Sequence, residues 1–162
     1  MQKVIILILC CLLLVGCTPE TPAPETATPT TNEVYEEPAA MEIIIYCGND
    51  NADGFETTTY EVNYYNGITL IEKLIEVGAL PEGIELLSEQ YDGTCLHLDF
   101  NNAFRDFVCS MGSSGEYMVI GSVVNTFLDN SNDVAQSVFI TIDGEIFESG
   151  HVIYDFKLTR HE

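Results

Sequence analysis

The sequence predicts an α+β fold in which two helices pack on a mixed or antiparallel β-sheet. Three observations support it: short segments rich in β-branched and aromatic residues, two longer segments with apolar residues at helical spacing, and Asp-Gly pairs between strand-like segments. Helices with one apolar stripe and strands with one apolar face bury these surfaces against each other. The expected order is β, β, α, a β-hairpin, α and a second β-hairpin, all within residues 42–162.

The first two elements are expected to be strands. Residues 42–47 (EIIIYC) are β-branched and aromatic, and residues 57–65 (TTTYEVNYY) alternate enough for a second strand. Between them, residues 48–54 (GNDNADG) have the composition of a turn. The two strands are therefore predicted to form a hairpin.

Residues 67–83 are expected to contain an amphipathic helix of about ten residues. Thr69 and Glu72 have the spacing of a capping box, and Gly78 followed by Pro81 marks the end. The apolar residues at helical spacing are Ile71, Leu74 and Ile75.

A hairpin is predicted over residues 84–100, with Asp92-Gly93 as its turn. On the second strand, alternation places two sets of side chains on opposite faces. One set is Leu96, Leu98 and Phe100, and the other is Cys95, His97 and Asp99.

A second helix of three to four turns is predicted after an irregular piece at residues 101–112. Ser113 and Glu116 form a second capping-box pattern at its start. Its apolar stripe consists of Ile120, Val123, Val124 and Phe127. A last hairpin is expected over residues 134–150, turning at Asp143-Gly144.

The N-terminal segment has the pattern of a bacterial lipoprotein precursor. Residues 1–16 combine Lys3 with an apolar run of about a dozen residues, too short for a membrane-spanning helix, and are predicted to be a signal peptide. Leu-Val-Gly-Cys at residues 14–17 matches the lipobox, so Cys17 is expected to carry diacylglycerol and anchor the chain in the membrane. The rest of residues 17–41 is rich in Pro, Thr and Glu and is predicted to be a disordered spacer before a single domain, 42–162.

The charge balance disfavours nucleic acid as a partner. The chain has 26 acidic and five basic side chains, a net charge of −21, and removal of Lys3 with the signal peptide would leave −22. Such a surface repels the phosphate backbone and has no basic patch. We therefore expect no binding of nucleic acid.

An ordered set of short motifs in the predicted domain resembles the GerMN domain, known from sporulation and spore germination. The motifs are LPEG (80–83), LHLDFNNAF (96–104), GSSGE (112–116), VVNTF (123–127), VFITIDGE (138–145) and LTR (158–160). The resemblance covers residues 43–160. It implies an extracytoplasmic, often lipid-anchored domain that works by interaction in spore formation, germination or envelope assembly, with no catalytic residues to carry over.

Two groups of residues are candidates for chemistry. Asn49, Asn51 and Asp53 resemble the start of a calcium loop, but the first position is not Asp and Tyr60 stands where the bidentate Glu belongs. A turn rich in Asn, Asp and Gly has the same composition.

Cys95, His97 and Asp99 could be metal ligands or a thiol with its base, and His151 would join them only if the fold brings it near. Residues two apart on a strand lie about 7 Å from each other, too far for direct nucleophile–base contact. We therefore predict no catalytic residue and no cofactor. Cys47, Cys95 and Cys109 are an odd number, so at least one thiol is free, and a buried thiol is the default for each.

The principal hypothesis is a non-enzymatic lipoprotein domain on the outer face of the bacterial cytoplasmic membrane. Its partners would be the membrane, through the lipid anchor, and envelope or spore-assembly proteins. The alternative is a small-ligand or cation-binding module that uses the acidic loops, and a hydrolase is the third possibility.

Overall fold

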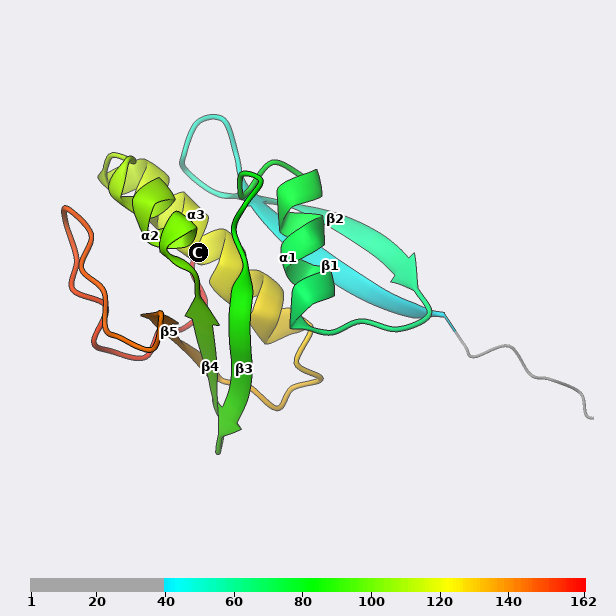
Figure 1. Cartoon of the computed structure of the whole chain (residues 1–162). Coiled ribbons are helices and arrows are strands. Elements are labelled where there is room, and N and C mark those ends of the chain that lie inside the picture. The colour runs from blue at the N-terminus through cyan, green and yellow to red at the C-terminus, as the bar shows by residue number, and fades with distance from the viewer. Residues whose placement is uncertain (1–39) are drawn as a thin grey trace, which may run out of the picture. The chain divides into compact units, whose positions relative to one another are not determined.

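The computed structural model describes residues 40–162 (Figure 1). The predicted signal peptide, Cys17 and nearly all of the predicted spacer lie outside the described residues. The observed elements are β1 (Met41–Gly48), β2 (Phe55–Val62), α1 (Gly67–Glu76), β3 (Leu86–Asp92), β4 (Cys95–Phe100), α2 (Asn102–Cys109), α3 (Ser113–Asp129) and β5 (Ser137–Ile142). The α+β class is therefore confirmed, with one more helix and one fewer strand than expected in this part of the chain.

Within residues 40–162 the strands form two sheets instead of one. β1 and β2 make an antiparallel hairpin, as predicted, and β3, β4 and β5 make a separate mixed sheet. Within that sheet β3 and β4 are antiparallel and β4 and β5 are parallel. The parallel pair requires a long crossover, which α2 and α3 supply.

Helix α3 contacts both β1 and β5, and it runs through the centre of the described domain in Figure 1. The predicted stripe of Ile120, Val123, Val124 and Phe127 is at most 1% exposed. The helix has 17 residues, more than the three to four turns expected, and polar residues on its other faces are buried as well. A helix that is covered on several sides buries more than one stripe.

Polar side chains along α3 and at its C-cap bond to the edge of β1, which keeps β1 apart from the sheet of β3, β4 and β5. Ser122 Oγ accepts the Gly48 N–H (3.0 Å), Thr126 Oγ1 accepts the Tyr46 N–H (3.0 Å), and Asn130 Oδ1 accepts the Ile44 N–H (3.1 Å). Four residues on a helix rise about 6 Å and two residues on a strand rise about 6.7 Å. Every fourth side chain of the helix can therefore reach every second N–H group of the strand. These side chains occupy the edge of β1 that another strand would use.

The two predicted capping boxes are both wrong, although both helices exist. Asn66 caps α1, because its side-chain oxygen accepts the Thr69 N–H at 3.0 Å. Gly112 precedes α3 and no side chain caps that helix. Glu116 instead points into the domain and is 2% exposed.

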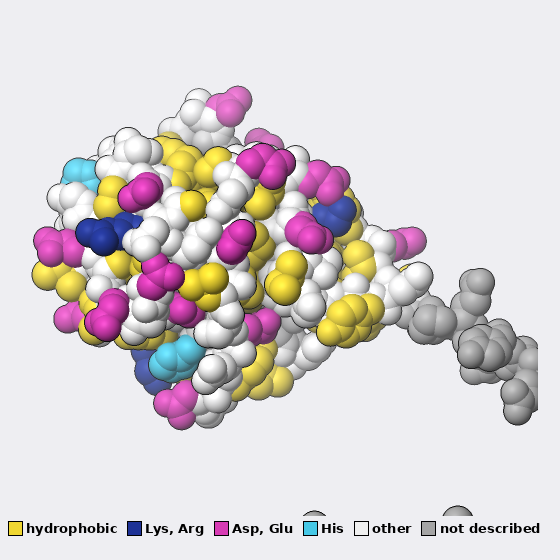
Figure 2. All heavy atoms as spheres, viewed as in Figure 1, with side chains coloured by type: hydrophobic (Ala, Val, Ile, Leu, Met, Phe, Trp, Pro, Cys, Tyr) yellow, Lys and Arg dark blue, Asp and Glu magenta, His cyan; other side chains and the backbone are white. Residues whose placement is uncertain are grey.

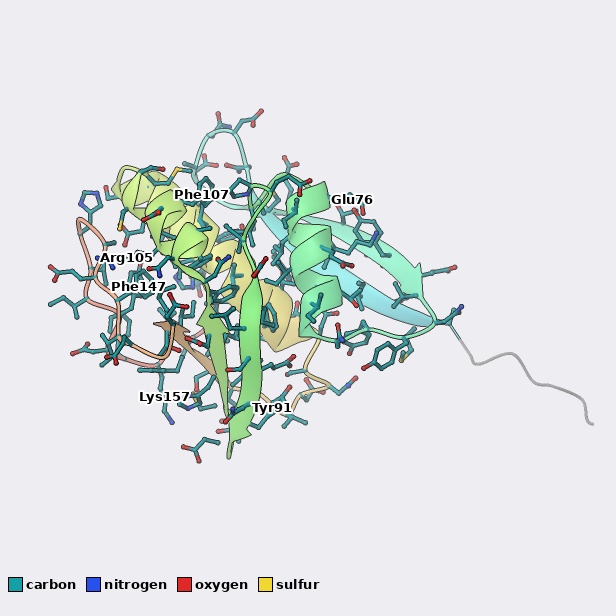
Figure 3. All side chains as sticks on the ribbon, viewed as in Figure 1. Glu76, Tyr91, Arg105, Phe107, Phe147 and Lys157 are labelled. Carbon is teal, nitrogen blue, oxygen red and sulfur yellow. The ribbon has the colours of Figure 1, made fainter. Side chains whose placement is uncertain are left out.

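The segment expected to be irregular contains helix α2. Phe104 and Val108 lie one turn apart and are both 0% exposed. The ring of Phe104 stacks on Phe100, with centroids 4.4 Å apart, and meets Phe147 edge-on at 6.3 Å. Figure 3 shows Phe147 on the side of the molecule where α2 lies.

The hairpin turns differ from prediction in detail. The β3–β4 turn consists of Gly93 and Thr94, one residue later than expected, and of these two only Gly93 has a positive φ, of 62°. Asp143 and Gly144 form the last turn as predicted, with φ values of 50° and 80°. After it, Glu145 makes only an isolated bridge to Ile142, so the predicted final strand is absent from the described chain.

No helix within residues 40–162 is long and apolar enough to cross a membrane.

Candidate functional site

A pocket of about 400 Å³ lies between the first half of α3 and the C-terminal segment. Glu116 comes from α3, and the rings of Tyr117, Tyr154 and Phe156 are part of the wall. Tyr117 and Phe156 are 42% and 47% exposed, whereas Tyr154 is 5% exposed. The pocket therefore combines a buried carboxylate with aromatic walls of graded exposure.

Only one of the two carboxylate oxygens of Glu116 accepts hydrogen bonds from the domain. Its Oε1 accepts hydrogen bonds from Ser149 Oγ at 2.6 Å and from Tyr154 Oη at 2.5 Å. Its other oxygen, Oε2, is buried and has no hydrogen-bond partner. No Lys or Arg of residues 40–162 pairs with it, since the ion pairs there are Lys73–Glu76 and Arg160–Asp129. A buried carboxylate without a positive partner is costly and calls for an explanation.

Ser149 is held in a fixed orientation for this contact. Its hydroxyl oxygen accepts the N–H groups of His151 (3.0 Å) and Val152 (2.9 Å). The hydroxyl hydrogen is therefore free to point at Glu116. The same turn places His151 in the pocket wall.

The C-terminal side of the pocket is fastened to α3. The Asn125 amide donates to the His161 carbonyl (3.0 Å) and accepts the His161 N–H (2.9 Å). Arg160 bonds to Asp129 and to the Tyr46 hydroxyl. Burial lowers the pKa of His161, which therefore favours the neutral form.

Replacing Tyr154 by Phe should lower the free energy of unfolding by about 2 kcal/mol at neutral pH, because a buried hydrogen bond to a carboxylate is lost. Burial, reinforced by Glu116, raises the pKa of Tyr154 in the folded state. Its contribution is therefore fully present below the unfolded pKa of about 10 and decreases as the pH rises above it.

Urea unfolding between about pH 9 and pH 11 checks this prediction. The stability difference between wild type and Tyr154→Phe should shrink as the pH rises. The stacked ring of Phe147, 4.5 Å from that of Tyr154, is kept in the variant. A difference that stays constant over this range would show that the pKa of Tyr154 is not raised in the folded state.

The sequence contained a signal for Glu116 that the capping-box interpretation concealed. Glu116 precedes Ile120 by four residues and Val123 by seven. It therefore continues the apolar stripe of α3 toward the N-terminus. An acidic residue on a buried stripe indicates an internal carboxylate.

The predicted calcium candidates form a hydrogen-bonded turn. The Asn49 amide donates to Asp53 Oδ1 (2.9 Å), and Asn49 Oδ1 accepts the Asp53 N–H (3.2 Å), while Asn51 is exposed. Within residues 40–162 no three His, Cys, Asp or Glu side chains are grouped as a metal site. The observed contacts are those of a hairpin turn.

His97 and Asp99 line one depression, but Cys95 and His151 do not line it, so the four candidates are not assembled into one site. Asp99 Oδ1 accepts hydrogen bonds from Thr141 Oγ1 (2.6 Å) and from the Gly144 N–H (2.8 Å), so it supports the last turn. His97 lies against Phe139, with ring centroids 5.2 Å apart, and its Nε2 is buried without a partner. Cys95 is buried. His151 lines the pocket of Glu116, whereas His97 and Asp99 do not line that pocket.

The three thiols of the described domain are free, and their exposure differs. Cys95 is buried, Cys47 is partly buried and Cys109 is exposed. Burial is the main cause that raises the pKa of the Cys47 thiol. The expectation of a buried thiol is therefore wrong for Cys109.

A second feature is an apolar surface over the start of α1 and along β3, called here the α1–β3 surface. Two adjoining depressions share Asn66, Gly67 and Glu89. The exposed apolar side chains around them are Met41 (39%), Tyr64 (71%), Ile68 (56%), Leu87 (46%) and Tyr91 (48%). Figure 2 shows hydrophobic side chains exposed among acidic ones on this face of the molecule, where Lys and Arg are few.

The α1–β3 surface has a rigid base. Glu89 on β3 accepts the Gly67 N–H at 3.1 Å, where the N-terminus of α1 favours a negative charge. This contact holds the strand against the helix. Figure 3 places Tyr91 on β3 and Lys157 in the C-terminal segment, so this surface and the Glu116 pocket occupy different parts of the domain.

Comparisons with known proteins give one family and one fold. The sequence model of the Germane family, described as sporulation and spore germination, matches residues 45–148. The structure of the tandem GerMN domains of the sporulation protein GerM from Bacillus subtilis matches at 18% identity with a TM-score of 0.58. That match covers 82% of this chain and 50% of the other, so this chain spans about half of it.

The first GerMN domain of the same protein, solved separately, matches at 17% identity with a TM-score of 0.55. This match covers 74% of the present chain and 98% of the domain. A search of curated proteins gives no match. The predicted resemblance to GerMN is confirmed, and the chain belongs to the Germane family of sporulation and spore germination domains.

Proposed function

We propose that this chain is a non-enzymatic, lipid-anchored interaction domain on the outer face of a bacterial cytoplasmic membrane. Its role is in spore formation, germination or the assembly of the cell envelope. Membership of the sporulation and spore germination family carries this proposal. The N-terminal lipobox pattern at Cys17 supports the location.

The α1–β3 surface is the proposed binding face. Its five apolar side chains are each more than a third exposed, and two of them are tyrosines, which are frequent in protein interfaces. The acidic side chains around them favour a partner with basic groups at the rim of its own interface. Met41 belongs to this surface and is the last residue of the predicted spacer.

Crosslinked affinity capture tests the biological role. The tagged chain is recovered from membranes of growing cells and, where the source forms spores, from cells induced to sporulate. Envelope proteins captured only during sporulation would support a spore-assembly role, and the same proteins captured in growth would support general envelope maintenance. Recovery of no protein from either preparation would contradict the interaction proposal.

Replacing Cys17 by Ser should move the protein from the membrane fraction to the soluble extracytoplasmic fraction, because the hydroxyl does not accept the diacylglycerol group. Two acyl chains give stable anchoring, whereas a single chain is marginal. Immunoblots of the separated fractions measure the shift. A Cys10→Ser variant is the matched control and should stay with the membrane; equal membrane retention of both variants would refute the lipobox interpretation.

A further inference from the structure

We infer that the Glu116 pocket binds a small organic ammonium compound with an apolar body. This inference is independent of the protein-binding role proposed above, since it concerns another part of the domain. It starts from the buried, unpartnered Oε2 of Glu116, a residue that is 2% exposed and lines the pocket. Native proteins rarely leave such an oxygen without a donor.

The charge of Glu116 favours an ammonium group over a neutral donor. Both donors that the domain supplies are hydroxyl groups, and both bond to Oε1. The one Arg side chain in the pocket wall, Arg160, is already bound to Asp129 and Tyr46. An ammonium group at Oε2 would supply both the missing hydrogen bond and the missing positive charge.

The walls of the pocket suit an apolar body beside that ammonium group. Tyr117, Tyr154 and Phe156 present aromatic surface, and rings of this kind attract cations as well as apolar groups. The volume of about 400 Å³ falls within the range of ordinary small-molecule sites. The pocket is therefore large enough for a ligand with one aromatic ring.

Lys157 restricts the class of ligand that fits the pocket. It lines the same pocket, is exposed, and forms no ion pair within residues 40–162. It would oppose a ligand with only positive charge and would attract a carboxylate. A zwitterion of the amino-acid type, with an ammonium group for Glu116 and a carboxylate for Lys157, fits both groups.

Two matched probes test this inference on the purified chain. L-Phenylalanine has the ammonium group, the carboxylate and the ring, whereas 3-phenylpropionate lacks only the ammonium group. Backbone amide NMR titration should show saturable shifts at residues 113–120 and 151–161 with phenylalanine. The affinity for 3-phenylpropionate should be at least tenfold weaker, a difference of about 1.4 kcal/mol in binding free energy.

Glu116→Gln keeps the shape of the side chain and removes its charge, and it should weaken phenylalanine binding at least tenfold. Because Glu116 is buried, its replacement can also affect folding, so Phe156→Ala serves as a second variant that changes only a half-exposed side chain of the pocket wall. Phe156→Ala should weaken phenylalanine binding several-fold and leave the melting temperature unchanged. Ile146→Ala, outside the pocket, should bind as wild type does. Equal affinity for the two probes, or no saturable shift up to about 10 mM phenylalanine, would overturn the inference.

Discussion

Replacing Asn130 by Ala should lower the free energy of unfolding by about 2 to 4 kcal/mol. Asn130 is 8% exposed, and its amide donates to the carbonyls of Ile44 and Thr126, both at 2.7 Å. Its oxygen accepts the Ile44 N–H. The alanine variant loses all three bonds and leaves the backbone of β1 unsatisfied in a partly buried place.

Urea unfolding of the chain without its predicted signal peptide measures this loss. Asn63→Ala is the matched control, because Asn63 is exposed, and it should change stability by less than about 0.5 kcal/mol. Hydrogen exchange at the Ile44 amide should also accelerate in Asn130→Ala. If the two variants were equally stable, the hydrogen bonds of Asn130 would not be what holds β1.

Replacing Phe104 by Ala should lower the free energy of unfolding by about 3 to 5 kcal/mol, the usual cost of removing a buried aromatic side chain. Phe104 is 0% exposed and lies between the rings of Phe100 and Phe147. The cavity would loosen both α2 and the segment that follows β5. That segment should therefore be cut faster in limited proteolysis.

Phe104→Leu is the control for this prediction. Leucine fills much of the same space without the stacked ring and should cost clearly less than alanine, with proteolysis close to that of wild type. Thermal and urea unfolding both measure the series. A loss below about 1 kcal/mol for Phe104→Ala would show that α2 is not part of the cooperative core.

The helices and strands with strong periodicity were predictable from the sequence. The stripe of α3 and the alternation along β4 both mark faces that are buried in the fold. The GerMN motifs added the family, which periodicity alone does not identify. The short helix α2 was missed because its eight residues have two buried positions, too few to establish a helical period.

The arrangement of these elements was harder to predict, because it depends on contacts between residues far apart in the sequence. Nothing local to Ser122, Thr126 or Asn130 shows that they bond to a strand some 80 residues away. Glu116 has the spacing of a helix cap, and only the position of Ser149 and Tyr154 gives it another role. The parallel pairing of β4 with β5 likewise depends on how α2 and α3 pack.

The candidate site was predictable only in part. The turn at Asn49 and Asp53 has the composition expected of it, and the contacts between these residues follow from that composition. The α1–β3 surface is assembled from three separate segments, around Met41, Tyr64 and Leu87. A surface of this kind has no sequence period and becomes visible only in the fold.

The central claim is that the domain binds a partner through the α1–β3 surface, and capture with a matched pair of variants tests it most directly. Ile68→Asp places a charge on a side chain that is 56% exposed, at the N-terminus of α1, where an acidic residue suits the helix. Ile146→Asp makes the same change at a side chain that is 55% exposed, in the segment after β5. We predict that Ile68→Asp captures about tenfold less partner protein from membranes than wild type does. Ile146→Asp should capture as much as wild type. Equal recovery by wild type and both variants would contradict the account.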